Sequence, residues 1–113
     1  MSGVANLYNV PSNDAELMAW SSVHMRHHVD INATIYRALA IALPLYLLDP
    51  IDVKDTGNWE DLHQQMHQEQ DAILGITGYD LTGLDFNDHN LLSAWIWINA
   101  LEHKQAADIL GIG

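Results

Sequence analysis

Tryptophan and polar side chains recur at helical spacing in three separate stretches of the chain. In each stretch a tryptophan is followed, four and eight residues later, by two polar residues. The three series are Trp20–His24–His28, Trp59–His63–His67 and Trp95–Asn99–His103. Because residues four apart share one face of an α-helix, each series predicts a helix that carries an indole and two polar groups along one stripe.

The first predicted helix runs from about Asp14 to Leu43. Asn13 is a good N-cap, and Glu16 stands three residues later, as in a capping box. The inward stripe continues at helical spacing through Leu17, Trp20, His24, His28, Ile31, Ile35, Ala38 and Ala42. Pro44 should end or kink this helix, because proline has no backbone N–H and clashes with the preceding turn.

Two further helices follow the same scheme. The second is predicted to begin after an Asn58 cap and to stop at Gly75, and the third to run from about His89 to Leu110. Residues 45–58 and 77–88 are rich in Asp, Gly, Thr and Pro, which favour turns.

An internal repeat supports this division. A shift of 36 residues superimposes Trp59 on Trp95 and the segment 73–76 on 109–112, both of which read Ile-Leu-Gly-Ile. The sequence therefore predicts an all-α fold: a small bundle of three main helices with long connectors. An extended N-terminal arm (residues 1–11) precedes a single helical-bundle domain (residues 12–113).

Composition narrows the classes of function. The chain has 113 residues, enough for one domain with its own core, and no cysteine, which excludes disulfides and thiolate ligands. A formal net charge of −11, from 15 acidic and 4 basic residues, opposes binding to nucleic acid. The most apolar stretch, Ala38–Leu48, is shorter than the ~20 residues that cross a bilayer. We expect no direct contact with nucleic acid or membrane.

The three series of polar residues have two interpretations. In the first they form a structural polar core, in which buried imidazoles and Asn99 satisfy one another by hydrogen bonds and set the helix register. Its members would be Trp20, His24, His28, Trp59, His63, His67, Trp95, Asn99 and His103. This interpretation needs no cofactor.

In the second interpretation the same histidines hold Zn or Fe. The ligands would be His24, His28, His63, His67, His103 and Asp108. His63-x3-His67 and His103-x4-Asp108 resemble ligand spacings of the hemerythrin family, although that family's His-x3-Glu pair and a fourth helix are missing. Glu60-x2-His63 resembles half of a ferritin-like di-iron motif. Both resemblances imply a metal-carrying bundle.

A third resemblance concerns assembly. The connector 78–88 (Gly-Tyr-Asp-Leu-x2-Leu-Asp-Phe-Asn-Asp), the segment 47–52 and the ending 102–112 are similar to small structural and assembly proteins of tailed bacteriophages. The resemblance implies a non-enzymatic virion component at the head, neck or adaptor, located in the virion and in the host cytoplasm during assembly. Its partners would be other virion proteins and further copies of itself.

Overall fold

The computed structural model describes residues 4–43, 56–79, 81, 83–85 and 87–112. These residues form a short helix, α1 (Val4–Leu7), and three long ones, α2 (Asp14–Leu39), α3 (Thr56–Leu74) and α4 (His89–Leu110), and they contain no strand. The prediction of an all-α bundle with three main helices is confirmed.

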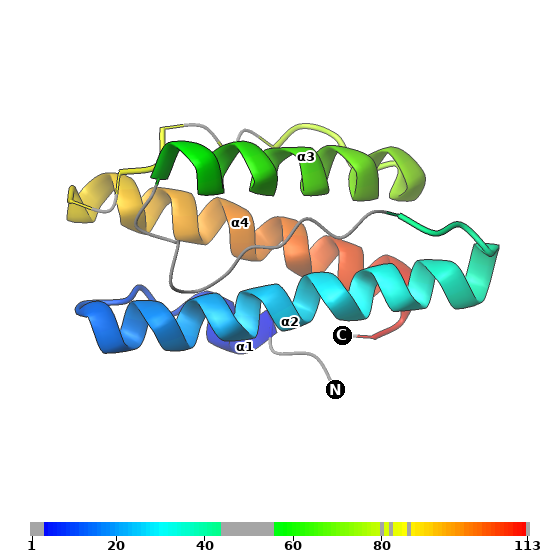
Figure 1. Ribbon diagram of the computed structural model, residues 1–113, viewed down its shortest axis with the longest axis horizontal. Coiled ribbons are helices and arrows are strands. Elements are labelled where there is room, and N and C mark those ends of the chain that lie inside the picture. The colour runs from blue at the N-terminus through cyan, green and yellow to red at the C-terminus, as the bar shows by residue number, and fades with distance from the viewer. Residues whose placement is uncertain (1–3, 44–55, 80, 82, 86, 113) are drawn as a thin grey trace.

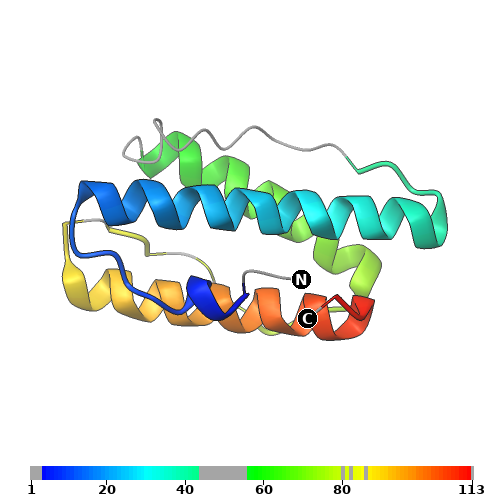
Figure 2. The same ribbon diagram turned by 90° about the horizontal axis from the view of Figure 1, so that it is seen from below.

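The three long helices run in the same direction, and each begins at the same end of the bundle (Figures 1 and 2). Parallel neighbours cannot be joined by a tight turn, so the chain has to return along the bundle between them. At 1.5 Å per residue, α2 is roughly 39 Å long. A segment the length of residues 40–55 reaches about 50 Å when extended. The long connectors are therefore a requirement of the parallel arrangement.

The predicted N-caps of α2 and α4 are confirmed. Asn13 accepts a hydrogen bond at Oδ1 from the backbone N–H of Glu16 (2.9 Å), and the Glu16 carboxylate accepts one in return from the Ser12 N–H (3.0 Å). Asp88 accepts from two backbone N–H groups in the first turn of α4. Both caps satisfy donors that a helix start would otherwise leave unpaired.

Helix α2 is shorter than predicted. It ends at Leu39 instead of Leu43, because Ala40 adopts a left-handed conformation (φ 57°) and donates its N–H to the Tyr36 carbonyl. Ala38, in the last turn of α2, and Ala42, beyond the helix end, were predicted to extend the inward stripe, but both are exposed. Pro44 lies outside the described residues, so its predicted effect on the helix is not observed.

Helix α3 begins earlier than predicted and ends where predicted. It starts at Thr56, which places Asn58 inside the first turn and makes its assignment as the N-cap wrong. At the other end, Gly75 is left-handed (φ 72°), and the N–H of Ile76 bonds to the Asp71 carbonyl. Gly111 and Ile112 close α4 in the same way. The Ile-Leu-Gly-Ile repeat is thus a repeated Schellman-type stop.

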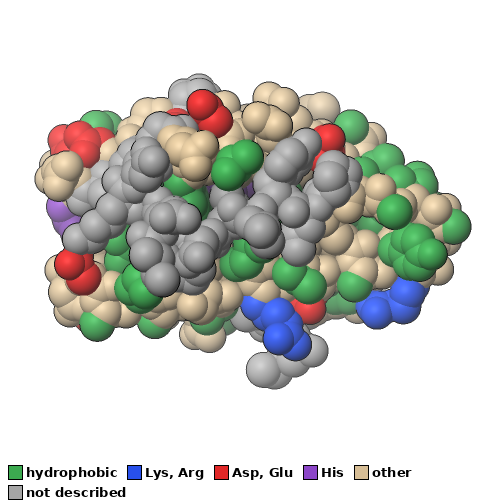
Figure 3. Space-filling view, viewed as in Figure 1, with side chains coloured by type: hydrophobic (Ala, Val, Ile, Leu, Met, Phe, Trp, Pro, Cys, Tyr) green, Lys and Arg blue, Asp and Glu red, His purple; other side chains and the backbone are tan. Residues whose placement is uncertain are grey.

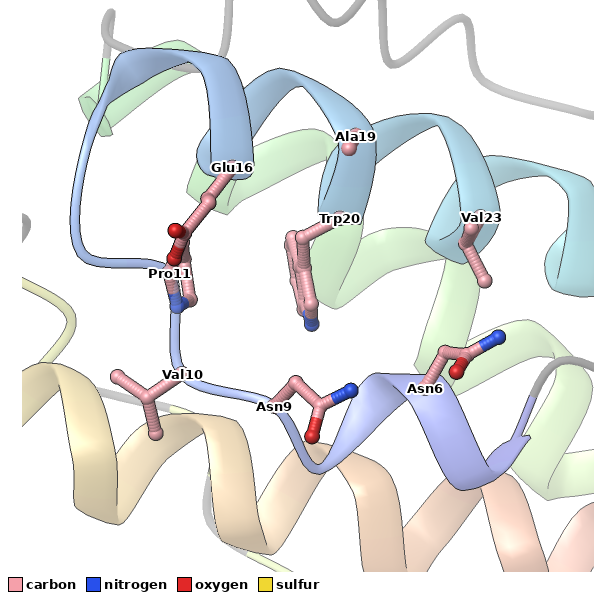
Figure 4. A pocket seen from close by; sticks show the side chains of 8 residues that line it. All are labelled: Asn6, Asn9, Val10, Pro11, Glu16, Ala19, Trp20 and Val23. Carbon is pink, nitrogen blue, oxygen red and sulfur yellow. The ribbon is translucent and has the colours of Figure 1, made fainter.

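The N-terminal arm is only partly extended. Its first described residues form α1, and Leu7 is fully buried against the bundle, where its carbonyl accepts a hydrogen bond from the indole of Trp20 (3.3 Å). Between the arm and α2 lies a groove of about 430 Å³, and the buried Trp20 side chain forms part of its wall (Figure 4). The arm is therefore packed along the bundle.

Two apolar clusters lie along the bundle. The larger contains the three tryptophans with Leu7, Leu17, Met66, Leu81, Leu84, Leu92, Ile96 and Ala100. The smaller contains Ile31, Ile35, Ile76 and Ala106. On α2 the histidines fall between Trp20 and Ile31, so the polar side chains lie between two dry segments of core.

Acidic side chains are scattered over the face seen in Figure 3 and do not form a patch there. No helix among the described residues is long and apolar enough to cross a membrane.

Candidate metal centre

The parallel helices place their three polar series in register. Trp20, Trp59 and Trp95 form a first layer, with ring centroids 5.7–6.3 Å apart. One helical turn further along, each helix contributes the next member of its series to a common layer. This register follows from the parallel direction, since antiparallel helices would bring a tryptophan opposite a histidine.

The second and third layers are polar. In the second, the ring centroids of His24 and His63 lie 4.7 Å apart, and Asn99 completes the layer with its Oδ1 3.3 Å from Nε2 of His24. The third consists of His28, His67 and His103, with centroids 4.4–4.9 Å apart. All nine residues of the predicted polar core are at least 95% buried.

Five of these histidines form one compact group, which we call the histidine cluster: His24, His28, His63, His67 and His103. One ring nitrogen from each lies within 4.8 Å of the others. A sixth histidine, His27, is also buried, and its Nδ1 lies 2.6 Å from Nδ1 of His103.

The orientation of His28 is defined by Gln70. The Gln70 side-chain amide donates to the His28 backbone carbonyl (3.3 Å) and to Oδ1 of Asn32 (2.6 Å). Its oxygen is then free to accept from Nδ1–H of His28 at 2.9 Å. With the proton on Nδ1, the lone pair of His28 Nε2 faces the cluster.

Nε2 of His24 lies at the centre of the contacts. It is 3.2 Å from Nε2 of His28, 3.0 Å from Nε2 of His63 and 3.3 Å from Oδ1 of Asn99. A neutral ring nitrogen carries either one proton or one lone pair, and it cannot satisfy three such neighbours.

Several buried polar atoms around this centre have no hydrogen-bond partner within the described part of the chain. They are Nδ1 of His24 and His63, Nε2 of His27, His67 and His103, and Nδ2 of Asn99. An unpaired buried polar group costs about 1–3 kcal/mol. The predicted polar core is therefore buried as expected, but its members satisfy one another only in part.

His67 also contacts two carboxylates. Its Nδ1 lies 2.8 Å from Oε1 of Glu102, although the alignment is not that of a hydrogen bond. Asp71, one turn after His67 on α3, completes a second group in which one ligand atom from each residue lies within 4.8 Å of the others. A pocket of about 210 Å³ reaches this group.

Burial keeps the histidines neutral. Desolvation lowers the pKa of His27 and His67 to about 4 and lowers that of the other four buried histidines well below its usual value. Burial, with a hydrogen bond to Glu102, raises the pKa of Asp71 to about 8, and burial also raises that of Glu102. Neutral imidazole is the form that binds metals.

Asp108, predicted as a sixth metal ligand, does not join the cluster. Its side chain is exposed and forms an ion pair with Lys104 at 2.7 Å. The hemerythrin-like spacing from His103 therefore has no counterpart in the packing of α4. Glu60, the acidic residue of the ferritin-like motif, is outside both groups of candidate ligands in the described residues.

Three residues at the site were missed by the sequence analysis, although two had a signal. Asp71 is the next step of the series Trp59–His63–His67, and His27 is three residues from His24, on the same face of α2. Glu102 stands seven residues after Trp95 and so shares its face of α4. Because buried carboxylates are rare, the sequence did not predict that Glu102 would be buried at the site.

Comparisons with family models, with curated proteins and with solved structures give no match for this chain. The chemistry of the site therefore depends on its own atoms. These are neutral imidazole nitrogens from three helices, an amide oxygen and two nearby carboxylates, all of which are possible ligands of a transition-metal ion.

Proposed function

We propose that the protein is a metal-binding helical bundle whose histidine cluster holds a divalent transition-metal ion. The observation that carries the proposal is that Nε2 of His28 and Nε2 of His63 lie 3.2 Å and 3.0 Å from Nε2 of His24 in a dry interior. Nitrogen ligands ~2.0–2.1 Å from one metal ion stand roughly 3.0–3.4 Å from each other. The separations are compatible with binding to a common ion.

Distance alone does not separate coordination from hydrogen bonding, because N–H···N contacts have similar lengths. The positions of the protons support a bound ion. His28 Nε2 carries no proton, because Gln70 holds that proton on Nδ1. If His24 Nε2 carries a proton, this single N–H faces two acceptors, His28 Nε2 and Asn99 Oδ1. If it carries no proton, its lone pair faces the lone pairs of those two atoms. A cation at this position would attract all of these lone pairs.

The surrounding residues support a bound ion in two further ways. In a histidine that binds a metal, the N–H of the second ring nitrogen usually donates a hydrogen bond to an oxygen that orients the ring. His28 makes this contact through Nδ1–H to Oε1 of Gln70. Burial also keeps the imidazoles unprotonated, so a metal need not compete with protons near neutral pH. A nitrogen-rich ligand set suits Zn²⁺ or Fe²⁺.

The test is metal binding by protein prepared without a histidine tag. Zn²⁺ or Co²⁺ should bind tightly, and Co²⁺ should give the visible absorption bands of a nitrogen-ligated ion. His63→Gln removes a central ligand and should weaken binding by at least 100-fold. The matched control is His89→Gln, an exposed histidine at the start of α4, which should bind as the wild type does.

Equal affinity in the two variants, with both folded by circular dichroism, would contradict the proposal. So would a wild-type protein that binds neither ion.

Assembly is a second candidate function, compatible with the first. The observation that favours it is Trp97, which is 55% exposed on α4 and packs edge-on against Tyr8 of the arm. Large exposed aromatic side chains are enriched in protein interfaces. A role in a virion stays a prediction from the sequence. Light scattering tests self-association: Trp97→Ser should lower the molar mass if this surface joins copies of the chain, and a monomeric wild type removes that possibility.

A further inference from the structure

A second set of possible ligands lies beside the histidine cluster. Asp71 on α3 and Glu102 on α4 meet at His67, which forms one group of possible ligands with both carboxylates. His67 belongs to both groups: Nδ1 faces Glu102, and Nε2 has no partner in the described chain. The two groups are therefore continuous through one imidazole.

Glu102 is the least expected residue of this set. Its side chain is only 2% exposed. The carboxylate shares a hydrogen bond with Asp71, whereas its Oε1 accepts no aligned hydrogen bond from any described residue. The basic side chains that the structure describes are engaged elsewhere: Lys104 with Asp108, Arg26 with Asp30 and Arg37 with Thr34. A buried carboxylate is stable only when a proton, a strong donor or a cation compensates its charge.

The pocket at this position gives access from solvent. Its volume of about 210 Å³ is lined by buried His67 and Glu102, by half-buried Asp71 and Gln64, and by Gln68 and Tyr79. Gln68 and Tyr79 are exposed. The histidine cluster, by comparison, lies between the tryptophan layer and the isoleucine cluster. An ion that enters from solvent by this pocket meets the two carboxylates first.

We propose that Asp71, Glu102 and His67 form a second divalent-cation site, at the inner end of this pocket, so that the loaded chain holds two ions. The inference rests on the proposed function for the first ion. The second site differs in chemistry, because two carboxylate oxygens and one nitrogen suit Mn²⁺, Fe²⁺ or Zn²⁺. Three protein ligands leave positions open to water from the pocket, as in catalytic and exchangeable metal sites.

The alternative role of Glu102 is to orient His67 toward a single ion in the histidine cluster. A carboxylate that accepts from the free nitrogen of a ligating histidine is a common arrangement. In that case only one ion binds, and the carboxylates change its affinity without changing the number of ions.

The number of bound ions separates these alternatives. Wild-type protein, loaded with excess Zn²⁺ and desalted, should contain two ions per chain by elemental analysis. Asp71→Asn and Glu102→Gln keep the size of the side chain but remove one carboxylate ligand, and each variant should contain one ion. Asp108→Asn is the matched control, a carboxylate on α4 that is exposed and paired with Lys104, and it should still contain two.

Each other result has a distinct meaning. One ion in the wild type and one in both carboxylate variants overturns the second site and leaves the proposed function intact. Two ions in every variant also overturns it, since the second ion then lies elsewhere. A wild type without any bound ion removes the proposed function itself. Because Asp71 and Glu102 lie on different helices, failure of one variant to fold leaves the other to decide.

Discussion

The chemistry of this protein depends on where individual protons lie. Gln70 shows how a single side chain fixes one of them: its two amide hydrogens point to carbonyl oxygens, so its own oxygen must accept from His28. That hydrogen bond leaves the lone pair of His28 Nε2 facing Nε2 of His24. Gln70 is not a proposed metal ligand, but it determines which nitrogen of His28 can bind the ion.

Replacing Gln70 should therefore weaken metal binding, although Gln70 is not itself a proposed ligand. Gln70→Leu leaves the buried Nδ1–H of His28 unpaired, which should cost about 1–3 kcal/mol of unfolding free energy. Loss of the orienting contact should also weaken Zn²⁺ binding by about 10–100-fold, measured by competition with a chelator. Gln68→Leu, exposed on the same helix, is the control. Unchanged affinity in Gln70→Leu would show that His28 is not a ligand.

At the scale of the helices, local sequence sets where each element begins and ends. The Asn13–Glu16 box, the Asp88 cap and the two Gly stops act within a few residues of the chain. The end of α2 is the exception, because Ala40 adopts a left-handed conformation without being glycine. Such a conformation costs an L-residue about 1 kcal/mol.

Two glycine substitutions close together should therefore have opposite effects. Ala40→Gly relieves the left-handed strain and should stabilise the fold by about 0.5–1 kcal/mol. Ala38→Gly, two residues earlier and exposed within α2, should destabilise it by about the same amount, because glycine is a poor helix former. Urea unfolding curves measure both. A loss of stability in Ala40→Gly would show that α2 continues past Leu39 in solution.

At the scale of the whole molecule, three parallel helices bring six neutral histidines into one dry volume. Two apolar clusters enclose them, and this enclosure is the main reason that their pKa values fall. The same enclosure raises the pKa of Asp71 and Glu102 at the edge of the site. The interior of the metal-free bundle is therefore sensitive to acid.

The metal-free protein should be less stable at pH 5 than at pH 7.5. A histidine with a lowered folded pKa supports folding above its unfolded value of ~6.5, and this support is lost as the pH falls. For His27 and His67, with pKa values of about 4, the loss at pH 5 is about 2 kcal/mol each. Four more histidines act in the same direction. Acidification favours the folded state through Asp71 and Glu102, but these are two groups against six.

Thermal unfolding with a chelator present should show a midpoint about 10 °C or more lower at pH 5. Equal midpoints would contradict the burial of the histidines. The proposed ion should reduce this sensitivity, because it competes with protons for the same nitrogens.

The sequence alone determined the helices, most of their ends, and the faces that carry tryptophan, histidine and Asn99. These properties follow from 3.6 residues per turn and from caps that act over a few residues, so they can be derived without knowing the fold. The tertiary structure decided that the helices run parallel, that three layers align, and that Glu102 and Asp71 meet His67 while Asp108 stays exposed. Register and proton positions depend on surfaces far apart in the chain, and periodicity within one helix carries no information about its neighbour.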